Sequence, residues 1–450
     1  MLLLTALLSS SPASAMELTW EGYYRARGLL YDSLSLSNTN AASEGTSNYL
    51  DHRLLLRPNW LLTPNAAVHA QIDLLPLTRW GEQPATYVDP VTGETVATAF
   101  TDGVSTSGPD ISGIRAWGEG KFEIRDVPVR IQMGRMPLHW GAGVLWNNGN
   151  DVLAEYGDSA DRLQVDTRFG PVFVMAAWDV QFEGFLGVPD DMQSASLALG
   201  YRSETVGVGL LNNYRYQPSL GYSAYTGDVW GFAQLGPVRA EVEAIGVFGS
   251  GDLDLNADGT ADANDVSVSA MGVMVRGGYQ MEKLAINAEF GVASGDGDTT
   301  DNKLKAFTFD RDHNVGLLLF EEPLPTLESA VVNDTNDGRT TEAAVTGEGV
   351  SNAIYFNPRI SYRFFPALQA ELGWVGAIQA KSPADGSRPG GYGSEFDLSI
   401  RVDPVPHVFG VGTVGVFLPG AFYRDYNDPD LGGGFDRPVV GLRFVGGVEF

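Results

Sequence analysis

One acidic segment has the residue spacing of a calcium-binding loop. Residues 254–265 read DLNADGTADAND, which matches the pattern D-x-N-x-D-G with acidic residues continuing to the twelfth position. This spacing gathers oxygen ligands around Ca²⁺, and Gly259 stands where such a loop turns sharply. The alternative is an acidic loop that is simply solvated. Ca²⁺ is therefore the one cofactor that the sequence suggests, as a structural ion in an external loop. The expected ligands are Asp254, Asn256, Asp258, Asp262 and Asp265.

Charged side chains recur at alternate positions in many short segments. In an extended strand such residues all lie on one face. Rows of Arg facing rows of Glu across water would create a transverse field, which suits the sorting of small polar or charged solutes. The alternative is that these groups pair across a packed interior. The expected pore-lining residues are Arg25, Arg27, Arg53, Arg57, Arg115, Glu119, Glu241, Glu243, Arg359, Arg363, Glu371, Arg401 and Arg443.

Residues for enzymatic chemistry are scarce. There is no cysteine, so a thiol nucleophile, a thiolate metal site and a disulfide framework are all excluded. The five histidines are dispersed, and neither G-x-S-x-G nor H-E-x-x-H occurs. We therefore expect that the protein is not an enzyme.

The charged rows belong to segments with a period of two residues. Phe396 to Asp403 alternates an apolar face, starting at Phe396, with a polar face that includes Arg401. About 18 segments of this kind predict an even number of strands, as single-chain bacterial barrels require. They lie near 17–31, 48–60, 65–78, 111–124, 127–136, 161–168, 171–181, 193–203, 205–216, 223–234, 237–249, 266–279, 282–294, 350–364, 367–380, 392–403, 406–420 and 437–450.

The connections between these segments alternate between short and long. Tight turns are expected at Thr63-Pro64-Asn65, Asp126-Val127-Pro128, Gly170-Pro171, Gly236-Pro237 and Asp403-Pro404, and long loops at 79–110, 137–160, 250–265, 295–349 and 421–436. Short periplasmic turns and long extracellular loops are typical of an all-β, antiparallel up-and-down transmembrane barrel. Such a sheet must close, because a bilayer offers no water to an unpaired edge. Both termini are then expected on the periplasmic side.

The start of the chain indicates export, and the net charge excludes one class of partner. Residues 1–15 are apolar and end in Ala13-Ser14-Ala15, the form that signal peptidase reads, so residues 16–450 are expected to form one barrel domain. No later segment approaches the roughly 20 continuous apolar residues of a transmembrane helix. The net charge of -27 makes nucleic acid a poor partner.

Four motifs carry a resemblance to known proteins. The last strand alternates apolar residues and ends at Phe450, which resembles the assembly signal of Gram-negative outer-membrane barrels. The segments GRMPLHWGAGVLWNNGND from Gly134 and FTFDRDHNVGLLLF from Phe307 are similar to elements of alginate-export-like and porin-like outer-membrane channels. The resemblance implies an 18-stranded barrel with a narrowed, charged lumen. The acidic loop at 254–265, by contrast, resembles the calcium loops of EF-hand-like repeats without their flanking helices.

Two loops are candidates for narrowing the lumen, around Trp140 to Tyr156 and within 295–349, where Val315 to Phe320 is unusually apolar. They either fold inward or form an external cap. The sequence thus predicts an outer-membrane channel for passive diffusion or export of small polar or charged solutes. The expected partners are outer-membrane lipid and lipopolysaccharide, the outer-membrane assembly machinery and the solutes themselves, while the sequence sets no oligomeric state. The alternative is a closed barrel that binds a surface partner, or is structural, through its long acidic loops.

Overall fold

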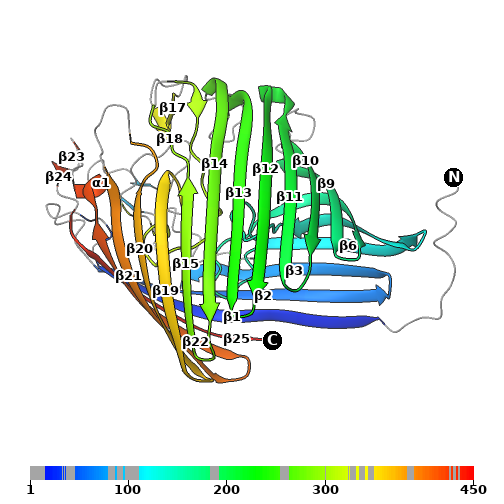
Figure 1. The fold of residues 1–450 in the computed structure, drawn as a ribbon, viewed down its shortest axis with the longest axis horizontal. Coiled ribbons are helices and arrows are strands. Elements are labelled where there is room, and N and C mark those ends of the chain that lie inside the picture. Colours follow the sequence, from blue (N-terminus) through cyan, green and yellow to red (C-terminus); the bar gives the residue numbers. More distant parts are fainter. Residues whose placement is uncertain are drawn as a thin grey trace.

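Long antiparallel strands make up most of the computed structural model (Figure 1). The structure describes residues 16–32, 34, 36, 46–79, 87–88, 95–96, 111–182, 192–253, 263–298, 301–322, 324, 331–333, 340–342, 349–382, 390–424, 427–428, 432–433 and 436–450.

Eighteen strands form the wall, as the alternation of apolar and polar residues predicted. They are β1 (Glu17–Asp32), β2 (Thr46–Thr63), β3 (Ala66–Arg79), β6 (Ile111–Ile124), β7 (Val127–Pro137), β8 (Ser159–Phe169), β9 (Val172–Phe182), β10 (Met192–Arg202), β11 (Val206–Gln217), β12 (Tyr222–Leu235), β13 (Val238–Leu253), β14 (Ala263–Gln280), β15 (Leu284–Ala293), β19 (Ala353–Phe365), β20 (Leu368–Gln379), β21 (Gly391–Val405), β22 (Val408–Pro419) and β25 (Val439–Glu449).

The remaining elements in the described ranges are short and belong to the segments that connect the wall strands along the chain. They are β4 (Tyr87–Val88), β5 (Thr95–Val96), η2 (Pro218–Leu220), β16 (Lys303–Leu304), β17 (Val331–Asn333), β18 (Thr340–Glu342), α1 (Ala421–Arg424), β23 (Asn427–Asp428) and β24 (Gly432–Gly433). Among the described residues, no helix is both long and apolar enough to cross a membrane.

The wall closes on itself without leaving an edge. Each wall strand pairs antiparallel with the next along the chain, and β25 pairs back onto β1. At the seam, the Gly22 amide donates to the Phe450 carbonyl at 2.8 Å, and the Phe450 amide donates to the Gly22 carbonyl at 3.0 Å. Closure satisfies the backbone groups that would otherwise be exposed to hydrocarbon.

Short turns lie at one end of the barrel and longer connections at the other. The short turns include those at 64–65, 170–171, 203–205 and 236–237. Because β1 begins and β25 ends beside these turns, both ends of the wall lie at the short-turn end. The predicted asymmetry between turns and loops is therefore present.

Two of the predicted turns are wrong in position. The turn before β7 uses Arg125 and Asp126, both with positive φ (51° and 66°), so Val127 and Pro128 already belong to the strand. At the other site, β21 runs through Asp403-Pro404 to Val405, and the turn falls at Pro406 and His407. The pairing with β22 is shifted between Val402 and Val405, and such an irregularity tolerates a proline, which has no amide hydrogen to donate.

The two faces of the wall differ as the alternation predicted. On β21, Phe396, Leu398, Ile400 and Val402 point outward with 39–48% of their surface exposed. The intervening Glu395 is fully buried toward the interior. An apolar outer face beside a polar inner face is the arrangement that a membrane-embedded barrel requires. Apolar residues also gather inside the barrel, where connecting segments pack against inward-facing wall residues such as Tyr31 and Phe417.

Candidate functional site

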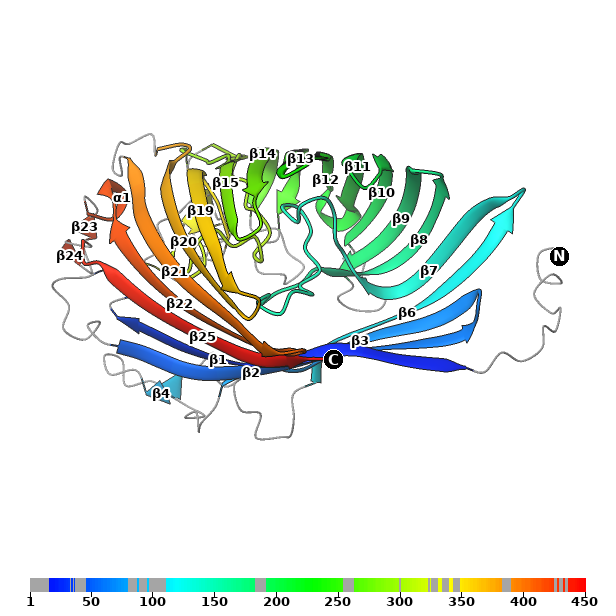
Figure 2. The same ribbon diagram turned by 60° about the horizontal axis from the view of Figure 1, so that its bottom comes forward.

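Two connecting segments fold into the lumen from the long-loop end (Figure 2). Loop A is residues 138–158, between β7 and β8, and loop B is residues 305–324, between β16 and β19, described except for residue 323. Val144 of loop A and Leu317 and Leu318 of loop B are at most 1% exposed and share one cluster with the wall residues Tyr31 and Phe417. Of the two arrangements left open by the sequence, inward folding is the one that occurs.

Trp140 illustrates what this packing changes. A tryptophan near a strand end is typical of the aromatic belt at a membrane surface, but Trp140 does not lie there. Trp140 is only 8% exposed and packs in a second apolar cluster with Trp146 and Trp230. It stabilises loop A against the inner wall. Trp20, by contrast, is 51% exposed on the outer face, where a belt residue belongs.

Each loop is held by one glutamate of the wall. Glu243 on β13 accepts hydrogen bonds from the amides of Ala142 (2.5 Å), Val144 (3.3 Å) and Leu145 (3.1 Å). Glu395 on β21 accepts hydrogen bonds from three successive amides of loop B, those of residues 317 (2.7 Å), 318 (2.8 Å) and 319 (2.7 Å). Both glutamates are fully buried. The alternation of β13 predicted Glu243 on the lumen face but did not indicate this role.

The loops also bind one another through aspartates of loop B. The Asp312 carboxylate accepts from the amides of Glu155 (2.8 Å) and Tyr156 (3.0 Å) of loop A. Asp310 accepts from the Asn147 amide at 3.2 Å, and the same amide lies 3.1 Å from Asp158. Burial, together with the neighbouring Asp158 carboxyl, raises the pKa of Asp310 to about 8. Burial also raises the pKa of Asp312 to about 6.

The predicted arginine row of β1, β2 and β6 lies beneath loop A. Arg25 donates to the Val152 carbonyl (2.8 Å) and Arg53 to the Ala154 carbonyl (2.9 Å). Arg115 donates to the carbonyls of residues 148 (3.1 Å) and 157 (2.5 Å). These arginines are at most 8% exposed. They face the interior, as the strand parity indicated, but they bind loop A instead of lining open space.

Carboxylates of the wall complete this row. Arg27 forms an ion pair with Asp51 at 2.8 Å and a second one with Glu155 of loop A. Arg53 likewise pairs with Asp73 at 2.5 Å. Two charges taken out of water are stable only when they are paired and hydrogen-bonded. The pairing alternative raised by the sequence therefore applies to this part of the lumen.

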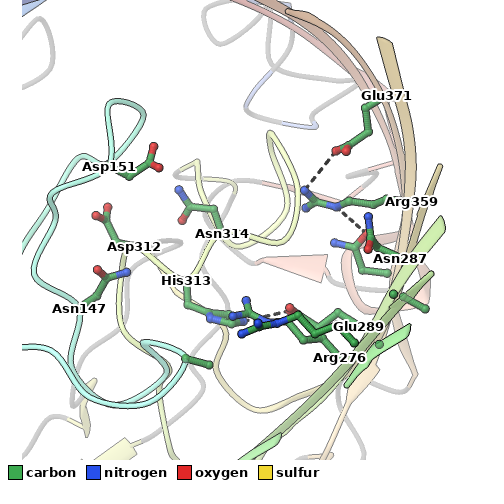
Figure 3. A pocket seen from close by; sticks show the side chains of 16 residues that line it. Asn147, Asp151, Arg276, Asn287, Glu289, Asp312, His313, Asn314, Arg359 and Glu371 are labelled. Atoms are coloured by element: carbon green, nitrogen blue, oxygen red, sulfur yellow. Dashed lines mark hydrogen bonds and ion pairs between the residues drawn. The ribbon is translucent and has the colours of Figure 1, made fainter. Parts of the chain in front are cut away.

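A cavity of about 520 Å³ remains between the loops and the wall of β13, β14, β15, β19 and β20 (Figure 3). We call it the eyelet. Arg276 and Arg359 line it from the wall with guanidinium-bearing side chains that are 42% and 36% exposed. Asp151 of loop A and Asp312 of loop B lie across the space from Arg359. Charges of both signs therefore line the same cavity.

The cationic side of the eyelet is held in place by the wall. Arg276 donates to Glu241 at 2.8 and 2.9 Å. Arg359 lies 3.5 Å from Glu371 and donates to the Val315 carbonyl of loop B at 2.9 Å. These contacts fix the guanidinium groups, so the positive charges of the eyelet are held in defined positions.

A buried acid–imidazole group closes one side of the eyelet. His313 of loop B lies 3.0 Å from Glu289 and 3.3 Å from the Tyr355 hydroxyl, which donates to Glu289 at 2.7 Å. No serine, threonine or lysine completes a nucleophilic arrangement among the described lining residues of the eyelet. Within the described ranges, no group of three or more His, Asp or Glu side chains is arranged to hold a metal ion.

The other expected lining residues lie on the wall away from the eyelet. Arg57 and Arg363 lie near the short-turn end, within 4.0 Å of Glu21 and 3.4 Å of Gln369 respectively. Glu119 lies 2.7 Å from Lys121, and Arg401 forms an ion pair with Asp403 at 3.0 Å. Arg443 lies on β25 opposite Thr413.

Most residues of the eyelet were not among the expected ones, and Arg276, Asp151 and Asp312 are three charged examples. The parity of β14 contained a signal for Arg276, because Met271 and Val275 point outward and residue 276 must then point inward. The sequence contains no such signal for Asp151 and Asp312, because residues in loops do not alternate between two faces. The expected calcium ligands from 254 to 262 lie outside the described residues. Asp265, the remaining one, has a positive φ of 53°, and its amide donates to Asp252 at 2.8 Å.

Comparison with known proteins defines the fold class. No protein-family model and no curated protein sequence matches this chain. Solved structures do match. Pseudomonas aeruginosa OccK8 (OprE) has 12% sequence identity and a TM-score of 0.51, covering 96% of this chain and 98% of its own. OccK2 (OpdF) and the outer membrane protein OpdK, both from the same organism, each have 9% identity and a TM-score of 0.54, with 96% and 98% coverage. At these identities the likeness shows a shared fold, that of an outer-membrane β-barrel.

Proposed function

We propose that this protein is an outer-membrane channel of a Gram-negative bacterium that lets small polar or charged solutes diffuse passively through its eyelet. The observation that carries the proposal is the eyelet itself, a cavity of about 520 Å³ in which the fixed Arg276 and Arg359 face loop carboxylates. Barrels of this strand number leave an aqueous interior unless loops fill it, and here the loops narrow it. A narrow passage with fixed charges selects by size and charge.

The solute class is bounded by the same geometry. OpdF was crystallised in complex with glucuronate and OpdK with vanillate, both of which carry a carboxylate. In this chain the wall arginines could meet such a group, while Asp151 and Asp312 would repel it from the opposite side. Solutes that carry both signs of charge, or none, therefore fit the passage better than a simple anion. Catalysis is not part of the proposal, because the eyelet holds no activated nucleophile among its described residues.

The barrel also supports the proposed location and partners. Its apolar outer face fits the outer-membrane lipid, with lipopolysaccharide in the outer leaflet. The terminal strand, ending at Phe450, is the segment that we propose the assembly machinery reads. Both termini are then periplasmic, at the end with the short turns.

Conductance of the purified barrel in a planar bilayer tests the proposal. We expect discrete openings, and a reversal potential in a salt gradient that shows which ions pass more easily. A preparation that is folded, as judged by its compact migration before heating, but silent where a control porin conducts, would overturn the channel function. That result would instead support the closed, surface-binding barrel.

A further inference from the structure

The two inward loops are attached to the barrel wall by the same local structure. Loop A has the sequence Gly-Ala-Gly-Val-Leu at 141–145, and loop B has Gly-Leu-Leu-Leu at 316–319. In each, a glycine precedes amides that converge on one carboxylate of the wall. Backbone amides that converge in this way form a concave anion-binding nest. The wall supplies the carboxyl group that accepts these hydrogen bonds, Glu243 for loop A and Glu395 for loop B.

The glycines are required by how closely each carboxylate approaches. A Cβ at Gly316 would lie 2.6 Å from Oε2 of Glu395, and one at Gly141 would lie 2.4 Å from Oε2 of Glu243. Both distances are shorter than a carbon–oxygen contact allows. Gly141 also has a positive φ of 56°, which favours glycine. Each nest is therefore shaped for its carboxylate.

A carboxyl group, which has two accepting oxygens, suits each nest better than a side chain with only one. Its two oxygens accept all three amide hydrogens, and both glutamates are fully buried, so water cannot replace them. A glutamine would keep one accepting oxygen and turn an N–H group toward an amide that also donates. The loop would then lose at least one hydrogen bond and gain a donor–donor contact.

The nests lie next to the residues that form the eyelet. Ala142, which binds Glu243, lines the eyelet directly, and Asp151 follows on the same loop. On loop B, Asp312 and Asn314 line the eyelet a few residues before the nest at 316–319. The position of each nest on the wall therefore fixes how far its loop reaches into the lumen.

We propose that Glu243 and Glu395 are the positioning residues that set the aperture of the channel, by holding loop A and loop B from two separate parts of the barrel wall. The effect on solute passage rests on the proposed channel function, whereas the attachment of the loops to the two glutamates does not. Neither glutamate lines the eyelet, so each acts on solute passage only through its loop.

Spin labels test the proposal independently of conduction. The chain has no cysteine, so Asn314→Cys in loop B and, in a second protein, Asp151→Cys in loop A each give a single labelling site. We expect Glu395→Gln to increase the mobility of the label on loop B, and Glu243→Gln to do so mainly on loop A. Glu371→Gln is the matched control, because it removes one lumen carboxylate that contacts Arg359 and neither nest.

In planar bilayers, Glu395→Gln and Glu243→Gln should raise the open-channel conductance, whereas Glu371→Gln should mainly shift the reversal potential. Gly316→Ala provides a second variant if Glu395→Gln does not assemble, since it disturbs the same nest from the loop side. Unchanged label mobility in the glutamate variants would overturn the positioning role. If the unmodified barrel never conducts, the proposed channel function is wrong. Label mobility would still show whether the two glutamates hold the loops.

Discussion

Raising the pH should loosen the contact between loops A and B, with Asp310 as a principal cause. Asp310 accepts from the Asn147 amide, and its own amide donates to the Val144 carbonyl at 2.8 Å. When the loops are docked, burial and the neighbouring Asp158 raise its pKa to about 8, from an ordinary value of 3.8. The negative charge of Asp312, on the same loop, also raises the pKa of Asp310.

The sign and size follow from proton linkage. Between the two pKa values the docked form keeps its proton and the released form has lost it, so docking weakens as the pH rises. The stabilisation is fully present below about pH 4, and it is lost progressively until the pH reaches about 8. The loss is about 1.4 kcal/mol for each pH unit, a tenfold change in the ratio of released to docked loops. Asp312, with a pKa of about 6, contributes in the same direction below pH 6.

The mobile fraction of a spin label at Asn314→Cys measures this equilibrium between pH 4 and pH 9. We expect it to grow as the pH rises and to level off above pH 8. Asp310→Asn removes the titrating group but keeps a side chain of the same shape. The ratio of released to docked loops should then depend less steeply on pH, by up to the equivalent of one proton. If Asp310→Asn leaves the slope unchanged, Asp310 is not the titrating group and the reasoning fails.

Four further predictions concern the eyelet, the wall and the loops. Glu371→Gln frees the positive charge of Arg359, so the reversal potential should shift toward anions; a shift toward cations would contradict the assigned electrostatics. Arg115→Met removes two charged hydrogen bonds from loop A, each worth about 1.5–3 kcal/mol, and should increase protease cleavage within that loop. Ile400→Arg places a charge on the outer face and should cost about 2–4 kcal/mol of folding free energy if it lies near the bilayer midplane, measured by urea titration in lipid. Ca²⁺ should raise the unfolding temperature, and Asp258→Asn should reduce that increase. Equal unfolding temperatures with Ca²⁺ and with a chelator would show that the loop at 254–265 does not bind Ca²⁺.

Most of the barrel wall follows from sequence period alone. A strand sends alternate side chains to opposite faces, so the apolar row of Phe396, Leu398 and Ile400 implies that Glu395 and Arg401 face the interior. The local sequence contains that information, and the strand positions are accordingly confirmed. The turns at Asp126 and Asp403 were misplaced by a few residues because proline marks both a turn and a strand irregularity.

Tertiary structure decided what the inward-facing charges do. Parity places Arg25 and Arg359 on the same kind of face, yet Arg25 is buried beneath loop A while Arg359 lines the eyelet. The difference arises from where the loops dock, and docking depends on residues far apart in the sequence. Glu395 binds loop B across more than 70 positions, and Glu243 binds loop A across about 100. The sequence by itself therefore determined a closed barrel with a charged interior, because strand period is a local property. Only the folded chain decided which of those charges hold the loops and which ones line the eyelet.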